Sequence, residues 1–273
     1  MNSLHETIFK NGSKTYYYSS FFFPPAVKED VFKLYSFVRI ADDYVDTIPQ
    51  EKQEFYDFKD KYHRALDGEK SGNLVIDSFV DLVHKRGFDP KWVDAFLYSM
   101  ESDLYINSYE TMDSLLKYLY GSAEVVGLMM SKILGLSEEA YNSARHLGRA
   151  MQYVNFIRDI NEDLYLGRNY FPRNEFIANN LQSLEPEDTR RNPVGFERFV
   201  RTQLQRFNTW QMEAEKGFKY IPKRYLIPIK TASQMYKWTA KIIERDPFIV
   251  YMRKVKPSIP RIVAQIGLNA VLT

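Results

Sequence analysis

Hydrophobic side chains along the chain recur mainly three and four residues apart, the spacing that places them on one face of an α-helix. One such stripe begins after Pro24 and Pro25 and ends before Pro49. It consists of Val31, Leu34, Tyr35, Val38 and Val45. Because proline is tolerated at a helix start and disrupts a helix interior, the pattern predicts an amphipathic helix between these prolines.

The same spacing, together with capping residues, predicts helices along most of the remaining chain. Asp89 with Pro90 is typical of a helix start, and so is Ser137 followed by two glutamates. Further helices are expected over residues 50–66, from 90 onward, and over 111–134, 137–166, 194–220, 228–245 and 259–272. Residues 174–192 are expected to be rich in loops, with 176–181 as a helical candidate. Alternating β-branched runs are nearly absent, so the sequence predicts an all-α fold.

No linker, internal repeat or low-complexity tract divides the chain, so residues 1–273 are expected to form a single helical domain. Such bundles often bind ligands in the core between their helices. Aromatic residues make up 15% of the chain, with 20 Tyr and 19 Phe. A large aromatic core explains this content most simply, and a cavity lined with rings for an apolar or cationic ligand is the alternative.

Charge and cysteine content exclude several classes of function. The net charge is only +2 and no long basic run occurs, so nucleic-acid binding is not expected. The absence of cysteine excludes disulfides and thiolate metal sites. Neither a secretory signal nor an uninterrupted apolar segment of membrane-spanning length is found. We therefore expect a cytoplasmic protein that does not span the membrane.

A first acidic stripe lies near the end of the helix expected before Pro49. Asp42 and Asp46 are four residues apart, so their carboxylates share a helix face, and Arg39 and Tyr35 precede them on the same side. Like charges at this spacing destabilise a helix by about 0.2–0.5 kcal/mol, which a divalent cation would offset. Taken alone, the motif is better explained by a solvated acidic helix end.

A second acidic stripe lies on the helix expected over residues 137–166. Asp159 and Asp163 are again four residues apart, with Asn155 one turn before Asp159 and Gln152 three residues before Asn155. Arg158 flanks this stripe. If the two stripes face each other, their combined negative charge requires cations, and hard oxygen ligands favour Mg²⁺, with Mn²⁺ as the alternative. The expected metal ligands are Asp42, Asp46, Asn155, Asp159 and Asp163.

Because Mg²⁺ commonly bridges carboxylates and substrate phosphates, the expected ligand is a diphosphate. Basic and amide side chains near the two stripes would bind its oxygens. The candidates are Lys14, Arg39, Asn155, Arg158 and Arg168. Other chemistries find no support, because no glycine-rich nucleotide loop, HExxH motif or Gly-x-Ser-x-Gly motif is present.

Several segments, in chain order, resemble the squalene/phytoene synthase family over most of the sequence. They are 13–16, 35–46, 118–127, 152–163 with its continuation to 172, and 232–236. The two aspartate motifs and the Gly-Arg-Asn-Tyr-Phe-Pro segment that ends at Pro172 are together highly specific. Tyr236 falls where the family places a C-terminal tyrosine, and we expect it at the diphosphate site. Glu124 departs from the usual glycine, and it either alters the reaction cavity or points away from it.

The resemblance implies an isoprenoid-synthase-type helical bundle with a central cavity and a two-step, magnesium-dependent reaction. One prenyl diphosphate loses its diphosphate, and the alkene of a second attacks the allylic cation to give a cyclopropylcarbinyl diphosphate. This intermediate ionises, rearranges and loses a proton. Aromatic faces would shield the carbocations in a dry cavity. Tyr35 and Tyr120 are the first candidates for this wall, and Tyr236 is a weaker one.

Small residues in the central segment allow two interpretations. Gly121, Ser122, Ala123 and Gly127 either let helices approach closely or leave room for an apolar chain. Glycine lowers helix stability by up to about 1 kcal/mol, so a steric reason is expected for the two glycines.

The favoured function is condensation of two geranylgeranyl diphosphates to phytoene, without NADPH. The alternative is a squalene, dehydrosqualene or hydroxysqualene synthase acting on farnesyl diphosphate. A non-catalytic assembly factor is less favoured because all four aspartates of the two motifs are present. A head-to-tail elongating enzyme or a terpene cyclase fits the second motif less well.

The C-terminal stretch from Lys254 to Leu272 combines basic and apolar residues. Because the product would be very apolar, this stretch is a candidate for transient contact with the membrane periphery. A terminal helix docked on the core is an equally good interpretation.

Overall fold

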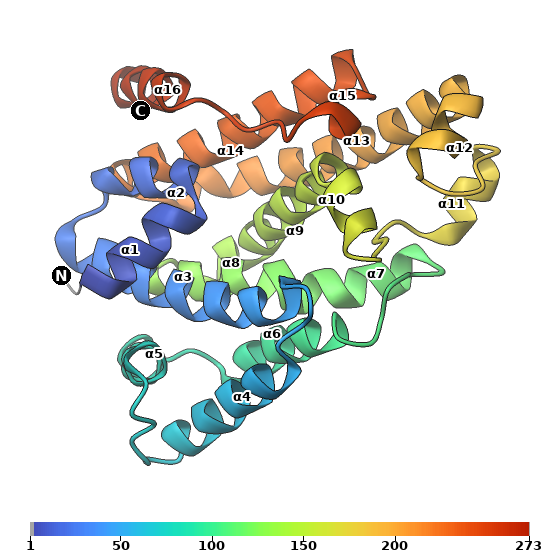
Figure 1. Cartoon of the computed structure of the whole chain (residues 1–273). Coiled ribbons are helices and arrows are strands. Elements are labelled where there is room, and N and C mark those ends of the chain that lie inside the picture. Colours follow the sequence, from blue (N-terminus) through green and yellow to red (C-terminus); the bar gives the residue numbers. More distant parts are fainter. Residues whose placement is uncertain (1–2, 273) are drawn as a thin grey trace.

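The structure is a computed structural model that describes residues 3–272, and within this range it confirms the predicted all-α fold. The only β pairing among these residues is an isolated bridge between Ser108 and Asn169. Helices of very different length make up the rest (Figure 1). No helix of residues 3–272 has both the length and the apolar character needed to cross a membrane.

The elements follow one another along the chain with mostly short connections. In order they are α1 (Ser3–Gly12), α2 (Lys14–Ser19), η1 (Ser20–Phe22), α3 (Pro25–Asp46), α4 (Lys52–Leu66), α5 (Leu74–Arg86), α6 (Pro90–Ser102), α7 (Met112–Leu119), η2 (Tyr120–Glu124), α8 (Val125–Leu134), η3 (Glu138–Ala140), α9 (Tyr141–Arg158), α10 (Ile160–Tyr165), α11 (Arg173–Ala178), α12 (Pro186–Arg191), α13 (Pro193–Glu215), η4 (Lys216–Tyr220), α14 (Lys223–Arg245), α15 (Ile249–Met252) and α16 (Ile259–Leu272). Of the η elements, η2 is a π-helix and the others are 3₁₀-helices.

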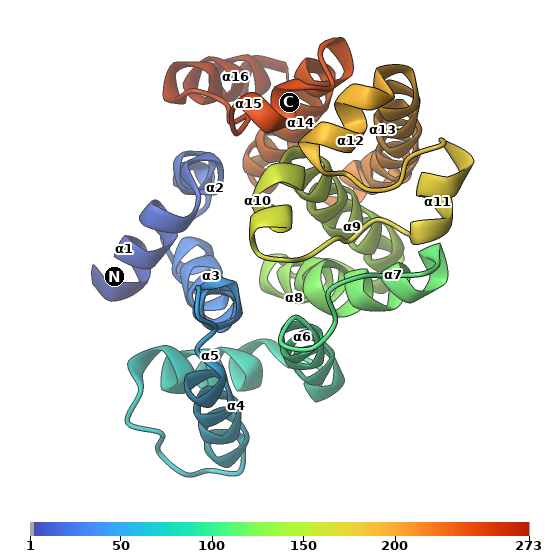
Figure 2. The same cartoon turned by 45° about the vertical axis from the view of Figure 1, so that its right-hand side comes forward.

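The long helices α3, α9 and α14 stand around one interior space together with α8 and α2 (Figure 2). Helix α13 packs along the outer side of α9, and α5 packs against α3 and α4. Helix α16 lies over α14 and α2. The helices that carry the two acidic stripes, α3 and α9, therefore lie on different sides of the same space.

Two aromatic-rich clusters form most of the hydrophobic core. In the first, Phe37 and Phe79 stack with their ring centroids 3.8 Å apart. In the second, Phe156 and Tyr170 stack at 4.1 Å. The high aromatic content thus serves the core to a large extent, as the simpler of the two interpretations predicted.

The predicted helices are mostly present, with three differences. The sequence pattern missed α1, α2 and α5 and the short helices α12 and α15, of which α12 lies in the stretch 174–192 that was expected to be rich in loops. The helix predicted over 137–166 is interrupted at Asp159, whose φ of −101° and ψ of 13° are not helical, before α10 continues it. The predicted start of a helix at Pro228 was wrong, because α14 begins at Lys223 and carries this proline in its interior. Proline is thus a probable and not a certain helix boundary.

Backbone contacts between helices explain why glycines occur in the central segment. A methyl group added at Gly127 would overlap the carbonyl of Ala144, and one at Gly121 would overlap the carbonyl of Ala95. Gly148 of α9 likewise lies against the Ala123 carbonyl. Helix α9 and the η2–α8 segment therefore touch backbone to backbone, so close helix approach is confirmed as the reason for the glycines.

We predict that Gly148→Ala lowers the free energy of unfolding by about 1–3 kcal/mol, because the added methyl group overlaps backbone that cannot move aside as a side chain can. The control is Gly267→Ala in α16, where no atom lies within 4 Å of the added carbon. This change should raise stability by up to about 1 kcal/mol through helix propensity. Urea unfolding measures both, and equal effects of the two variants would contradict the packing argument.

Candidate functional site

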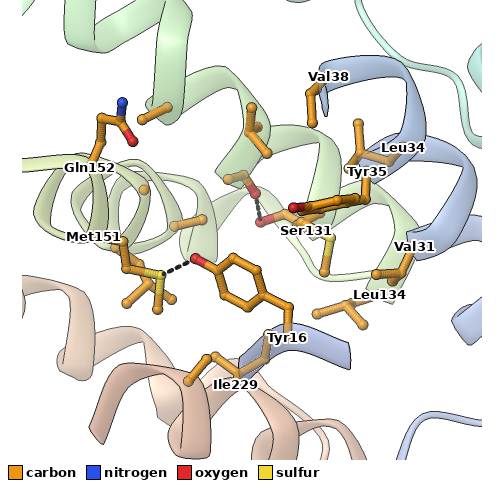
Figure 3. A pocket seen from close by; sticks show the side chains of 18 of the residues that line it. Tyr16, Val31, Leu34, Tyr35, Val38, Ser131, Leu134, Met151, Gln152 and Ile229 are labelled. Carbon is orange, nitrogen blue, oxygen red and sulfur yellow. Dashed lines mark hydrogen bonds between the residues drawn. The ribbon is translucent and has the colours of Figure 1, made fainter. Parts of the chain in front are cut away.

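A cavity of about 340 Å³ lies between α2, α3, α8, α9 and α14, and most of its wall is apolar. Figure 3 shows that α3 contributes Val31, Leu34 and Val38, while Leu134, Met151 and Ile229 come from three other helices. These side chains can enclose a long hydrocarbon chain and exclude water from it.

Polar side chains line the cavity near the C-terminal ends of α3 and α9. Along α3 the lining passes from Val31 to Arg39 and Asp42, and along α9 it passes from Ala144 to Asn155. Gln152 and Tyr236 also belong to this polar part of the lining. The cavity thus joins an apolar interior to a polar end, which we call the mouth, as an amphipathic ligand requires.

The two acidic stripes face each other at this mouth, as expected. Arg168, which follows the second stripe, donates to Asp46 of the first at 2.6 Å and also to the carbonyl of Val45. The pKa of Asp163 is raised well above its ordinary range by burial and by the charges of Asp159 and Asp46. Residues far apart in the sequence therefore share one electrostatic environment.

Arginine side chains hold three of the four aspartates. Arg39 binds Asp42 at 3.3 Å and also binds Asp43. Arg158 forms a two-point pair with Asp159 at 2.7 and 2.5 Å. Between residues 3 and 272 no three carboxylate or imidazole groups are gathered as a metal-ligand cluster. The carboxylates face one another across the mouth and are paired with guanidinium groups.

The residues at the mouth nevertheless fit a divalent cation. The pKa of Asp42 is raised well above its ordinary range by burial and then by the charge of Asp46, so nearby positive charge would stabilise its ionised form. The buried Oδ1 of Asn155 has no hydrogen-bond partner within the described part of the chain. Hard oxygen atoms of this kind are the ligands that Mg²⁺ prefers.

The segment after α15 brings two further cations that the sequence did not assign to the site. Lys254 lies 3.3 Å from Asp159 and also pairs with Glu162. Lys256 follows two residues later. Burial, and then the charges of Lys254 and Arg158, lower the pKa of Lys256. Lys254 is thus engaged in ion pairs at the second acidic stripe, and only the folded chain brings it to Asp159.

Three tyrosines line the cavity, and they are not the three that the sequence favoured. Tyr35 and Tyr236 do line it, and Tyr16 of α2 joins them with its hydroxyl donating to Tyr236 at 2.9 Å. In Figure 3 the Tyr16 hydroxyl points towards the sulfur of Met151. Tyr120 does not line the cavity, because η2 turns its ring towards the guanidinium of Arg145, 5.4 Å from the ring centroid.

The remaining expected diphosphate-binding residues lie outside the cavity wall. Arg158 and Arg168 pair with carboxylates of the two acidic stripes at the mouth but do not line the cavity. Lys14 is the first residue of α2, two positions before Tyr16, and it does not line the cavity. The structure therefore brings Arg39, Arg158 and Arg168 to the acidic groups, whereas within the described residues Lys14 forms no salt bridge with them.

A buried carboxylate behind the mouth was not singled out from the sequence. Asp103 accepts hydrogen bonds from Tyr118 at 2.7 Å and Tyr170 at 3.1 Å, and burial raises its pKa to about 7. Arg168 lies 3.4 Å from the hydroxyl of Tyr170. Asp103 thus supports the arginine that holds Asp46. Its sequence neighbourhood carries no motif that would have marked it.

Glu124 points away from the cavity. Its fully buried carboxylate accepts from Arg145 at 2.8 Å and from Arg149 at 2.6 Å, both on α9. Glu124 therefore ties the π-helix η2 to α9 from the outer side, while Ser122 and Ala123 of η2 line the cavity. Of the two alternatives left open by the sequence, Glu124 takes the second.

We predict that Glu124→Ala lowers the free energy of unfolding by about 2–4 kcal/mol, because it leaves two guanidinium groups without their shared buried partner. The control is Glu213→Ala, which removes a solvent-exposed pair with Lys216 and should leave the free energy of unfolding nearly unchanged. Urea unfolding measures both. A loss as small as that of the control would contradict a clamping role for Glu124.

The fold and the mouth form an all-α protein whose cavity suits an amphipathic, anionic ligand. Comparison with known proteins identifies the family to which this chain belongs. The profile of the squalene/phytoene synthase family matches residues 9–262, and the chain belongs to this family. Its activity is thereby that of a prenyl transferase of the head-to-head type.

Individual relatives are distant and carry several names. A 15-cis-phytoene synthase of Synechocystis is 28% identical over 91% of this chain and 78% of its own length. A 4,4'-diapophytoene synthase of Staphylococcus haemolyticus is 27% identical over 84% and 82%. A solved dehydrosqualene synthase with a bound ligand shares the fold with a TM-score of 0.86 at 20% identity, covering 99% of this chain and 95% of that one.

Proposed function

We propose that the protein condenses two geranylgeranyl diphosphates head to head into phytoene through a cyclopropylcarbinyl diphosphate. The observation that carries this proposal is the single cavity with an apolar interior and a mouth where two acidic stripes and several cations meet. Each half-reaction breaks one carbon–oxygen bond and releases one diphosphate and one proton. The similarity to named phytoene synthases supports the twenty-carbon substrate.

The cations of the mouth would receive the diphosphate. Arg39, Arg158 and Arg168 already pair with carboxylates, and their planar guanidinium groups suit two-point contacts with phosphate oxygens. Lys254 and Lys256 would add two ammonium groups from the C-terminal segment. These cations stabilise the charge that develops on the departing group, and the apolar wall keeps water from the allylic cation.

Asp42, Asp46, Asn155, Asp159 and Asp163 would hold the metal ion. When bound, Mg²⁺ supplies positive charge that neutralises the leaving diphosphate. Mn²⁺ is the alternative ion, because it binds the same kinds of oxygen ligand. The proton that each half-reaction releases can pass to the departing diphosphate, and the ring faces of Tyr35, Tyr16 and Tyr236 would lie along the path of the cation.

We also propose that residues 1–273 act as one unit, because α2, α3, α9 and α14, which span most of the chain, line one cavity. The non-catalytic alternative is disfavoured, since the four aspartates and their arginine partners are all in place. The very apolar product supports contact with the membrane periphery. The thirty-carbon alternative is supported by the diapophytoene synthase among the relatives.

To test the substrate, purified protein is incubated with Mg²⁺ and either geranylgeranyl or farnesyl diphosphate, each with and without NADPH. Mass spectrometry should identify phytoene from the twenty-carbon donor without reductant. A thirty-carbon hydrocarbon as the main product would instead favour the alternative, a synthase that acts on farnesyl diphosphate. Neither product nor diphosphate release under any condition would favour the non-catalytic assembly factor.

Asp42→Ala and Asp159→Ala should each reduce diphosphate release at least about a hundredfold, because each removes a charged metal ligand at the mouth. The matched control is Asp60→Ala on α4, an exposed aspartate that belongs to neither stripe and pairs with Arg64, which should keep full activity. Circular dichroism should show unchanged helix content for all three. Full turnover by either Asp42→Ala or Asp159→Ala would contradict the metal-site assignment.

A further inference from the structure

The outward face of α16 is apolar over its whole length. Four large side chains on it expose half or more of their surface to solvent. They are Val263 (53%), Leu268 (52%), Val271 (83%) and Leu272 (66%). The only charged residue of the helix is Arg261, near its start. A terminal helix that merely covers the core is expected to turn charged side chains outward, so this face fits an apolar surface.

Buried contacts on the inner side of α16 fix which face is turned outward. Ile262 and Ile266 pack against Met235 of α14. The fully buried amide of Asn269 donates to Thr231 at 2.9 Å and to Gln234 at 2.7 Å. Rotating the helix about its axis would break these hydrogen bonds in a buried place, so the apolar exposure is built into the packing.

The apolar surface continues from α16 onto η1. Phe21 and Phe22 expose 48% and 42% of their surface. Phe21 packs against Tyr18, which in turn contacts the cluster of Met235, Ile262 and Ile266 beneath α16. The ammonium of Lys28 lies 4.2 Å from the centre of the Phe21 ring. An exposed ring beside a lysine is typical of side chains at a lipid headgroup boundary.

The charged residues of the C-terminal segment have one sign. From residue 247 to 272 the chain has no acidic residue and four basic ones. They are Arg253, Lys254, Lys256 and Arg261, of which Lys254 is already paired with Asp159 and Glu162. Exposed Lys223 and Arg224 begin α14, whose first half lies beside the end of α16, as the contact between Thr231 and Asn269 shows. Basic residues that border an apolar face complement an anionic lipid surface.

The helices beneath α16 also line the cavity. Tyr16 of α2 and Ile229 of α14 face the cavity interior, while the same two helices support α16 on their outer sides. Figure 1 shows α16 lying across them at the edge of the molecule. The apolar interior and the outward face of α16 are therefore separated by a single layer of helices.

We propose that α16, with Phe21 and Phe22, seats the protein on an anionic lipid bilayer, with the outward face of α16 in the headgroup boundary. The docking itself stands on the exposed surface and its charges. The consequence that a hydrocarbon product passes directly into the bilayer between α2 and α14 rests on the proposed function.

Co-sedimentation with vesicles tests the docking. Full-length protein is mixed with vesicles of phosphatidylcholine alone or with phosphatidylglycerol added, in the absence of substrate. Binding should be at least tenfold stronger to the anionic vesicles and should weaken with salt. The double variant Val263→Glu with Leu268→Glu should lose this binding at least tenfold. The matched control, Val194→Glu with Met212→Glu on α13, replaces side chains of 74% and 60% exposure and should bind as the wild type does.

Fluorescence gives an independent measure, because the chain has no cysteine and a single introduced one can be labelled cleanly. An environment-sensitive dye on Leu268→Cys should shift to the blue when anionic vesicles are added, and the same dye on Val194→Cys should not. Circular dichroism and thermal unfolding establish that the variants are folded.

Three results would overturn the proposal. The first is wild-type vesicle binding by the α16 double variant, and the second is equal loss of binding in the α13 control. The third is a dimer by light scattering that the α16 variant abolishes, since a second copy of the chain would then cover the face. Because vesicle binding is measured without substrate, failure here leaves the proposed reaction untouched, and failure of the reaction leaves the docking untouched.

Discussion

Concentrating the carboxylates of two helices at the end of one cavity creates repulsion, and the structure offsets it with cations drawn from distant parts of the chain. Arg39 belongs to the same helix as its aspartates, whereas Arg168 reaches Asp46 from beyond the second stripe and Lys254 reaches Asp159 from the C-terminal segment. The ion pairs at the mouth therefore link α3, α10 and the chain after α15. Removing that balance would separate the elements that form the site.

The rest of the cavity depends on how closely the helices approach. Backbone contacts at Gly127 and Gly148 bring η2–α8 against α9, and Glu124 clamps the same pair from outside through two arginines. The glycines and the buried ion cluster thus act on opposite sides of one helix pair. Their combined effect is to place Ser122 and Ala123 in the cavity wall without letting the wall collapse inward.

The two ends of the molecule serve the two halves of an amphipathic ligand. In the proposed reaction, the mouth would supply charge to a diphosphate, and the apolar interior, bounded by α2 and α14, would accept a hydrocarbon chain. The α16 surface extends this apolar character to the outside of the same two helices. In the proposed reaction, one chain would thereby handle two substrate molecules that each carry a diphosphate and a product that carries none.

Sequence alone determined the all-α fold, the family resemblance and the pairing of Asp42 with Asp46 and of Asp159 with Asp163, because helical spacing and motif order are local properties. Only the tertiary structure decided which distant groups join them. It turned Tyr120 towards Arg145, brought Tyr16 into the cavity, and placed Lys254 and buried Asp103 around the acidic mouth. Such contacts depend on how helices pack, and no local pattern of residues records that packing.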